Sequence, residues 1–225
     1  MKKRFVIIGA AVYACFIVPF AVAQHAGSVR GTVADENGIP VVAARVSVDR
    51  LDGRPRAFPV REAETDKNGH FSISNLEQGI YGVFAMKESS GYPDTASSFY
   101  SSNIFPTATL TAEIPTVDLV LKIGPPAGVV TGLVTDVTTN QPIDATFLLR
   151  RTASPDNWIS LSQRPNYRVL VPPSADVSFE VSAPGYKTYY YGSVSDLLRR
   201  PPLRLESGRE MKLDIQLEPG ERPPN

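Results

Sequence analysis

Hydrophobic and polar residues alternate one by one along much of the chain, which is the period of a β-strand whose two faces meet different surroundings. Between His70 and Ser74, for example, Phe71 and Ile73 alternate with polar residues. Apolar residues at helical spacing do not continue beyond about one turn. The inward-facing set predicted for the first half of the chain is Val29, Val33, Val46, Val48, Phe71, Ile73, Val83, Ala85, Leu119 and Leu121.

The alternating segments are short, and Asn-Gly and Pro punctuate them. In the first half of the chain they predict strands at 28–34, 44–48, 57–65, 70–74, 81–87, 104–110 and 117–123. In the second half they predict strands at 129–135, 146–151, 158–161, 167–171, 177–182, 187–191 and 212–217. Seven short strands in about 100 residues are typical of an antiparallel β-sandwich, so the pattern predicts an all-β protein.

The two halves also repeat one another. Gly27, Val29, Gly31, Val33 and Asp35 recur 101 positions later as Gly128, Val130, Gly132, Val134 and Asp136. The closing residues Leu119, Leu121 and Ile123 recur 94 positions later as Leu213, Ile215 and Leu217. We therefore predict two tandem seven-stranded sandwiches, at 27–123 and 127–218, separated at Gly124-Pro125-Pro126, where prolines lack the N–H that a ladder requires. The Pro-rich tail 219–225 is predicted to be disordered.

The first segment has the features of a secretory signal peptide. Three basic residues precede an apolar run from Phe5 to Phe20, and Ala21-Val22-Ala23 supplies a small-x-small cleavage site. A permanent membrane anchor is the alternative, because a spanning helix needs about 20 apolar residues. We predict a signal peptide at 1–23, a secreted or periplasmic protein of a bacterial envelope, and no membrane span after cleavage. Cys15, the single cysteine, would leave with that segment.

Charge narrows the classes of partner. Lys and Arg together number 23, and Asp and Glu together also number 23. Binding to a nucleic-acid backbone needs a surplus of basic residues. The balance therefore argues against a nucleic-acid partner.

The opening run Gly27-Ser-Val-Arg-Gly-Thr-Val-Ala-Asp35 and the hairpin Thr65-Asp-Lys-Asn-Gly-His-Phe71 resemble the carboxypeptidase regulatory-like domain, as does the turn from Leu76 to Tyr81. The resemblance implies a seven-stranded, prealbumin-like sandwich from Gly27 to about Ile123. The second copy keeps the opening and closing strands but lacks the Asp-x-x-Gly-x-Phe hairpin. It is identified as a divergent domain of the same type.

Catalytic and metal-binding patterns are not found. A zinc peptidase centre needs two His and a Glu, whereas the chain has only His25 and His70. Ser28 does not have the spacing of a hydrolase nucleophile. Asp35 and Asp66 both begin Asp-x-Asn-Gly, which suggests a calcium loop or a turn, and the further oxygen ligands of a calcium site do not follow. We predict no catalytic residue, no metal and no cofactor.

Aromatic residues give the best candidates for recognition. Tyr189, Tyr190 and Tyr191 are consecutive, and Trp158 lies earlier in the same half. Flat amphipathic rings suit stacking on sugars and equally suit protein contacts, but such rings also pack in cores. Alternation places Tyr189 and Tyr191 on one face and Tyr190 on the other. The predicted ligand-binding residues are Trp158, Tyr189 and Tyr191. The first half offers a second aromatic group: Tyr92, Phe99, Tyr100 and Phe105.

These observations favour a non-enzymatic binding or structural accessory module, with a protein or polysaccharide surface as its partner. A carbohydrate-binding module that uses the surface aromatics is the alternative. A hydrolase is the third reading and lacks a catalytic constellation.

Overall fold

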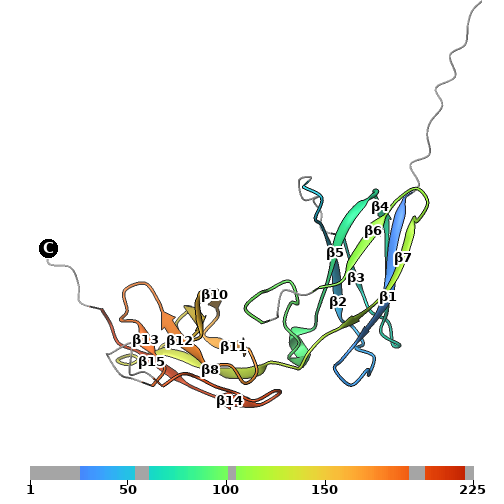
Figure 1. Cartoon of the computed structure of the whole chain (residues 1–225). Helices are drawn as coiled ribbons and strands as arrows, with labels where there is room; N and C mark the ends of the chain where they lie inside the picture. Colours follow the sequence, from blue (N-terminus) through green and yellow to red (C-terminus); the bar gives the residue numbers. More distant parts are fainter. Residues whose placement is uncertain (1–25, 54–60, 101–104, 193–200, 221–225) are drawn as a thin grey trace, which may run out of the picture.

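The computed structural model describes residues 26–53, 61–100, 105–192 and 201–220. The predicted signal peptide and the start of the strand predicted at 57–65 lie outside these ranges. In the described ranges no helix has the length and apolar character needed to cross a membrane. The described chain is almost entirely β-structure and forms two sandwiches, one after the other (Figure 1).

The first sandwich consists of two sheets with the orders β4-β1-β7 and β3-β2-β5-β6. Its strands are β1 (Gly27–Ala34), β2 (Arg45–Arg50), β3 (Arg61–Glu64), β4 (His70–Leu76), β5 (Gly79–Met86), β6 (Thr107–Leu110) and β7 (Thr116–Lys122). A single 3-10 turn, η1 (Glu88–Ser90), follows β5.

The second sandwich has the same strand order. Its sheets are β11-β8-β14, with β15 also paired to β8, and β10-β9-β12-β13. Its strands are β8 (Gly128–Asp136), β9 (Ala145–Arg151), β10 (Ser154–Gln163), β11 (Asn166–Val171), β12 (Val177–Ser182), β13 (Tyr189–Tyr190), β14 (Glu210–Lys212) and β15 (Ile215–Leu217). The segment predicted as one closing strand at 212–217 is therefore divided between β14 and β15.

Each sandwich contains parallel pairing, because the closing segment returns to lie beside the opening strand in the same direction. β7 is parallel to β1, and β14 and β15 are parallel to β8; the other strand pairs are antiparallel. This close approach explains the repeated glycines. A Cβ atom on Gly31 would overlap the carbonyl oxygen of Leu119, and one on Gly132 would overlap that of Leu213.

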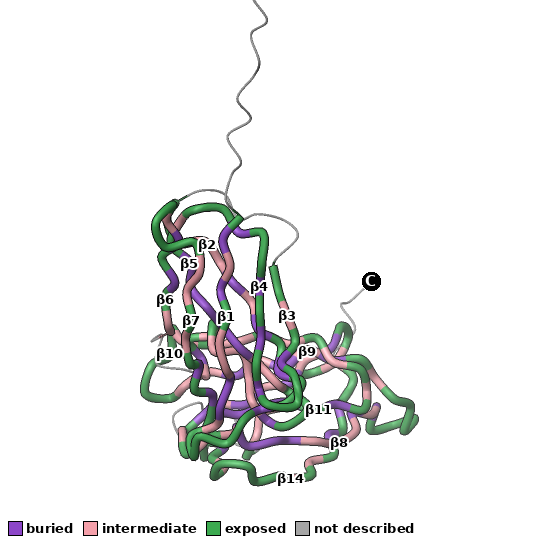
Figure 2. Tube along the Cα trace, turned by 90° about the vertical axis from the view of Figure 1, so that its right-hand side faces the viewer, coloured by how far each residue is buried: buried purple, intermediate pink, exposed green. Residues whose placement is uncertain are grey.

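A hydrophobic core holds each sandwich, and Figure 2 shows where buried residues lie along the strands. The first core contains the residues predicted to face inward, of which Leu119 is only partly buried. The second core is built around Phe147, Leu149, Phe179 and Ile215, which are at most 2% exposed. Each core removes large apolar surfaces from water, the main favourable contribution to folding.

The tail requires one correction. Pro219 forms an isolated bridge with Tyr186, and the Gly220 N–H donates to the carbonyl oxygen of Gly185 at 2.8 Å. These two backbone contacts order the start of the segment that was predicted to be disordered from residue 219. Residues 221–225 lie outside the described ranges.

Candidate functional site

The structure separates the three aromatic residues that the sequence singled out. Trp158 lies on β10 with 51% of its surface exposed, on the outer face of the second sandwich. Tyr189 and Tyr191 are half-buried and pack against the second core. Tyr189 lies beside Val181, which is fully buried. The two tyrosines therefore do not share a surface with Trp158.

The register of the sheet places Tyr190 on the face of Trp158. Tyr190 pairs with Glu180 on β12, and Glu180 pairs with Leu148 on β9. Leu148 in turn pairs with Ser160 on β10, two residues from Trp158. The sequence did not identify Tyr190 as a surface residue, because alternation places neighbouring tyrosines on opposite faces of a strand without showing which face is turned to the core.

Arg150 is the second residue that the sequence did not identify. It pairs with Trp158 across β9 and β10, and its guanidinium carbon lies 5.8 Å from the centre of the indole ring. This distance is within the range of a cation–π interaction, which holds the ring and the charge together. The outer face thus carries an exposed aromatic ring beside a cation.

A row of hydroxyl groups crosses the same face. Thr146 on β9 pairs with Ser162 on β10 on one side and with Ser182 on β12 on the other. An open hollow of about 490 Å³ lies over this row, with Asp144 and Arg164 among its lining residues. Hydroxyl, carboxylate and guanidinium groups give this end of the sheet many hydrogen-bond donors and acceptors. We refer to the surface of Trp158, Arg150, Ser162, Thr146 and Ser182 as the outer face.

A second group of aromatic residues joins the two sandwiches. The connection between β5 and β6 leaves the first sandwich and reaches the second (Figure 1). Phe99, on this connection, is 1% exposed and belongs to the core of the second sandwich. Its ring packs edge-on against Tyr100, with centroids 5.0 Å apart. The second core is therefore completed by a side chain from the first half of the chain.

Hydrogen bonds fix this connection in place. Arg151 Nε donates to the carbonyl oxygen of Phe99 at 2.8 Å, and Asn157 Nδ2 donates to that of Ser98 at 2.9 Å. The Tyr100 hydroxyl donates to the carbonyl oxygen of Leu170 at 3.1 Å. Burial raises the pKa of the Tyr100 hydroxyl well above its usual range. We refer to Ser98, Phe99 and Tyr100 with their partners as the joint.

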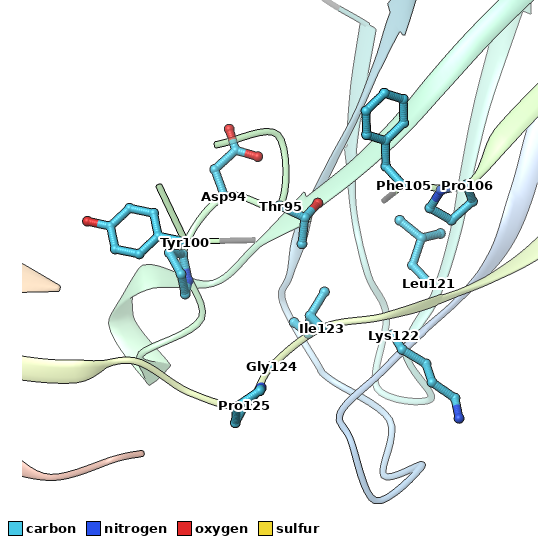
Figure 3. A pocket seen from close by; sticks show the side chains of 11 residues that line it. Asp94, Thr95, Tyr100, Phe105, Pro106, Leu121, Lys122, Ile123, Gly124 and Pro125 are labelled. Atoms are coloured by element: carbon cyan, nitrogen blue, oxygen red, sulfur yellow. The ribbon is translucent and has the colours of Figure 1, made fainter. Parts of the chain in front are cut away.

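A pocket of about 340 Å³ lies beside the joint (Figure 3). Asp94, Thr95 and Tyr100 line one side, and the end of β7 with Gly124 and Pro125 lines the other. The buried side chains of Leu121 and Ile123 contribute apolar surface. This lining is not the convergent set of polar groups that a specific small-molecule site requires.

The two carboxylates that suggested calcium loops accept hydrogen bonds from backbone N–H groups within their own turns. Asp35 Oδ1 accepts the N–H groups of Asn37 and Ile39 at 2.9 and 2.8 Å. Asp66 Oδ1 accepts those of Asn68 and His70, both at 2.8 Å. The N–H of His70 contributes most to lowering the pKa of Asp66. Across the described ranges no three His, Cys, Asp or Glu side chains lie close enough together to hold a metal ion.

Asp136, the repeat counterpart of Asp35, has an additional partner. Its Oδ1 accepts the N–H groups of Thr138 and Thr139, and its Oδ2 accepts the hydroxyl of Tyr186 at 2.9 Å. The Thr139 N–H and then the Tyr186 hydroxyl lower the pKa of this carboxyl group. Asp136 thereby ties the turn after β8 to the segment that follows β12.

One known family is similar to the first sandwich. The family model of the carboxypeptidase regulatory-like domain matches residues 28–120. No curated protein is similar enough in sequence to count as a relative.

Several solved structures are similar over most of the chain. The Bacillus anthracis TIE protein is 16% identical over 86% of this chain and 34% of its own, with a TM-score of 0.34. The streptococcal ancillary pilin is 13% identical over 89% of this chain and 64% of its own length, with a TM-score of 0.37. The shaft pilin SpaA of Lactobacillus rhamnosus GG is 10% identical over 88% of this chain and 100% of its own length, with a TM-score of 0.32. The chain thus spans about a third of the first of these proteins and 64% of the second.

Proposed function

We propose that this chain, in which residues 28–120 are a carboxypeptidase regulatory-like domain, is a non-enzymatic accessory module of a bacterial envelope. In this proposal the second sandwich is a divergent domain of the same type, and the two sandwiches act as one rigid unit. The unit presents the outer face at a fixed orientation to a protein or polysaccharide surface.

The burial of Phe99 in the second core supports this proposal most directly. Interfaces between domains of one chain are often small and polar, so neighbouring domains usually move relative to one another. Here the connection inserts a fully buried ring into the neighbouring sandwich, and three hydrogen bonds anchor it. Rotation of one sandwich against the other would withdraw that ring from its core.

Small-angle X-ray scattering tests the rigid unit. We expect one shape to fit the scattering of the unmodified chain, whereas Phe99→Ala should need a mixture of shapes. Phe105→Ala is the matched control, because Phe105 packs on Phe84 within the first sandwich at a centroid distance of 4.6 Å. If the unmodified chain itself requires a mixture of shapes, the proposal is wrong.

Export is the part of the proposal carried by the first 23 residues. A basic start, an apolar run and Ala21-Val22-Ala23 support a signal peptide. N-terminal sequencing of protein from the envelope fraction should begin at Gln24. A chain that still begins at Met1 would instead support the membrane anchor.

Carbohydrate binding is the second candidate, and the exposed indole of Trp158 favours it. The ring lies near a row of hydroxyl groups on one face of a sheet, an arrangement suited to stacking on a sugar and bonding its hydroxyls. Trp158→Ala should abolish retention on a polysaccharide column that retains the unmodified chain. Val120→Ala, which changes a residue 61% exposed on the first sandwich, should leave retention unchanged. Equal retention of both variants would exclude Trp158 from the binding site.

A further inference from the structure

The free edge of β10 has features of a pairing surface. β10 is ten residues long and pairs with β9 on one side, at Ser154 and, after a register shift, from Trp158 to Gln163. Within the described residues no strand pairs with its other side. An open edge presents unpaired N–H and C=O groups, and proteins usually protect such edges with charge, proline or shortness.

The other edges carry this protection or have no apolar surface left to cover. β13 has two residues, β15 has three and β6 has four. β3, β7, β11 and β14 contain charged residues within the strand: Arg61, Glu62, Glu64, Asp118, Lys122, Arg168, Glu210 and Lys212. β4 is the remaining edge, and its inward residues Phe71 and Ile73 are already 5% and 3% exposed.

β10 carries Pro155 and Asp156 near its start, but from Asn157 to Gln163 it has neither charge nor proline, and its apolar residues there are incompletely covered. Ile159 and Leu161 face the second core but are only half-buried. β9 pairs with both residues on one side, and no described strand pairs with them on the other. A strand added at this edge would extend the sheet and cover both residues.

We propose that the added strand is β10 of a second copy of this chain, paired antiparallel about a two-fold axis through Ser160. In this register Ile159 lies opposite Leu161, and Trp158 lies opposite Ser162. Residues directly opposite in an antiparallel pair share a face, so apolar side chains meet apolar ones on the core side. The two outer faces then form one continuous surface.

Charge complementarity supports a second copy as the occupant. The same register places Asp156 of each copy opposite Arg164 of the other, which gives two symmetrical pairs of opposite charge. Both residues are exposed, and neither forms an ion pair with another described residue. Like charges are not brought together at any position from 156 to 164. Self-complementarity of this kind is what a two-fold interface requires.

Cysteine cross-linking tests the register directly. In a Cys15→Ser chain, which has no other cysteine, Ser160→Cys places two thiols opposite one another at the axis. Directly opposite residues have Cα atoms about 4.5 to 5.5 Å apart, within the range that a disulfide spans. Ser162→Cys is the control, because its two copies would be about 13 Å apart along the strands. We expect a covalent dimer from Ser160→Cys alone.

A charge exchange tests the same interface without cysteine. Arg164→Asp should shift the chain from dimer to monomer in analytical ultracentrifugation, because it places two carboxylates together. Adding Asp156→Arg to that variant should restore the dimer. A monomer at every concentration, a dimer unaffected by Arg164→Asp, or equal cross-linking at both cysteine positions would each overturn the proposal.

Discussion

Replacing Phe99 by Ala should destabilise the second sandwich, although Phe99 belongs to a connection of the first. The ring is 1% exposed, packs on Tyr100, and lies with its centre 5.9 Å from the guanidinium carbon of Arg151. Removing a fully buried phenylalanine costs about 3 to 5 kcal/mol, because apolar burial is lost and a cavity remains. We expect the free energy of unfolding of the second sandwich to fall by this amount.

The sequence provides a selective probe for this measurement. Trp158 is the only tryptophan of the chain and lies in the second sandwich. Urea unfolding followed by its fluorescence therefore reports that sandwich. With a slope of about 1 to 3 kcal/mol per molar urea, the midpoint should fall by at least about 1 M. Phe105→Ala should leave this midpoint in place. An unchanged midpoint for Phe99→Ala would refute the assignment of this ring to the second core.

Three further variants test other parts of the structure. Gly132→Ala should lower the free energy of unfolding by about 1 to 3 kcal/mol, because its Cβ would overlap the carbonyl oxygen of Leu213; an unchanged thermal melting temperature would contradict this. The double variant Tyr189→Ala with Tyr191→Ala should melt at lower temperature, since both rings pack against the second core; a fully stable double variant would show that these rings are free for binding. Asp136→Asn should reduce stability at pH 7 and flatten the fall of melting temperature in acid. The folded state lowers the pKa of Asp136, so this carboxylate stabilises the fold above the ordinary carboxyl pKa of about 4, and the stabilisation is lost as pH falls through the lowered pKa of the folded state. An acid profile identical to that of the unmodified chain would contradict this.

Local pattern was enough to predict much of the fold. Phe71 and Ile73 lie in a strand that alternates cleanly, so their inward direction followed from the sequence. The repeated Gly31 marked an equivalent place in both halves, but its reason, a parallel strand passing close to it, is a contact distant in sequence. Alternation also separated Tyr189 from Tyr190. Which of them faces the core depends on the register with β12, which no local pattern encodes.

The joint was the least predictable feature. Phe99 lies in a Ser-rich stretch without alternation, and apart from the adjacent Tyr100 the residues of its core cluster belong to the other sandwich. No periodicity reports a side chain that leaves its own domain. The cation–π contact between Arg150 and Trp158 likewise depends on the pairing of β9 with β10.

The distance between the two sandwiches in solution tests the rigid unit most directly. Spin labels on Ser72→Cys and Asn166→Cys, both at exposed positions on β4 and β11, can be introduced in a Cys15→Ser chain. Dilution with unlabelled chain removes distances between copies. The account predicts one narrow distribution of distances, which broadens when Phe99 is replaced by Ala. A broad distribution in the chain that retains Phe99 would contradict it.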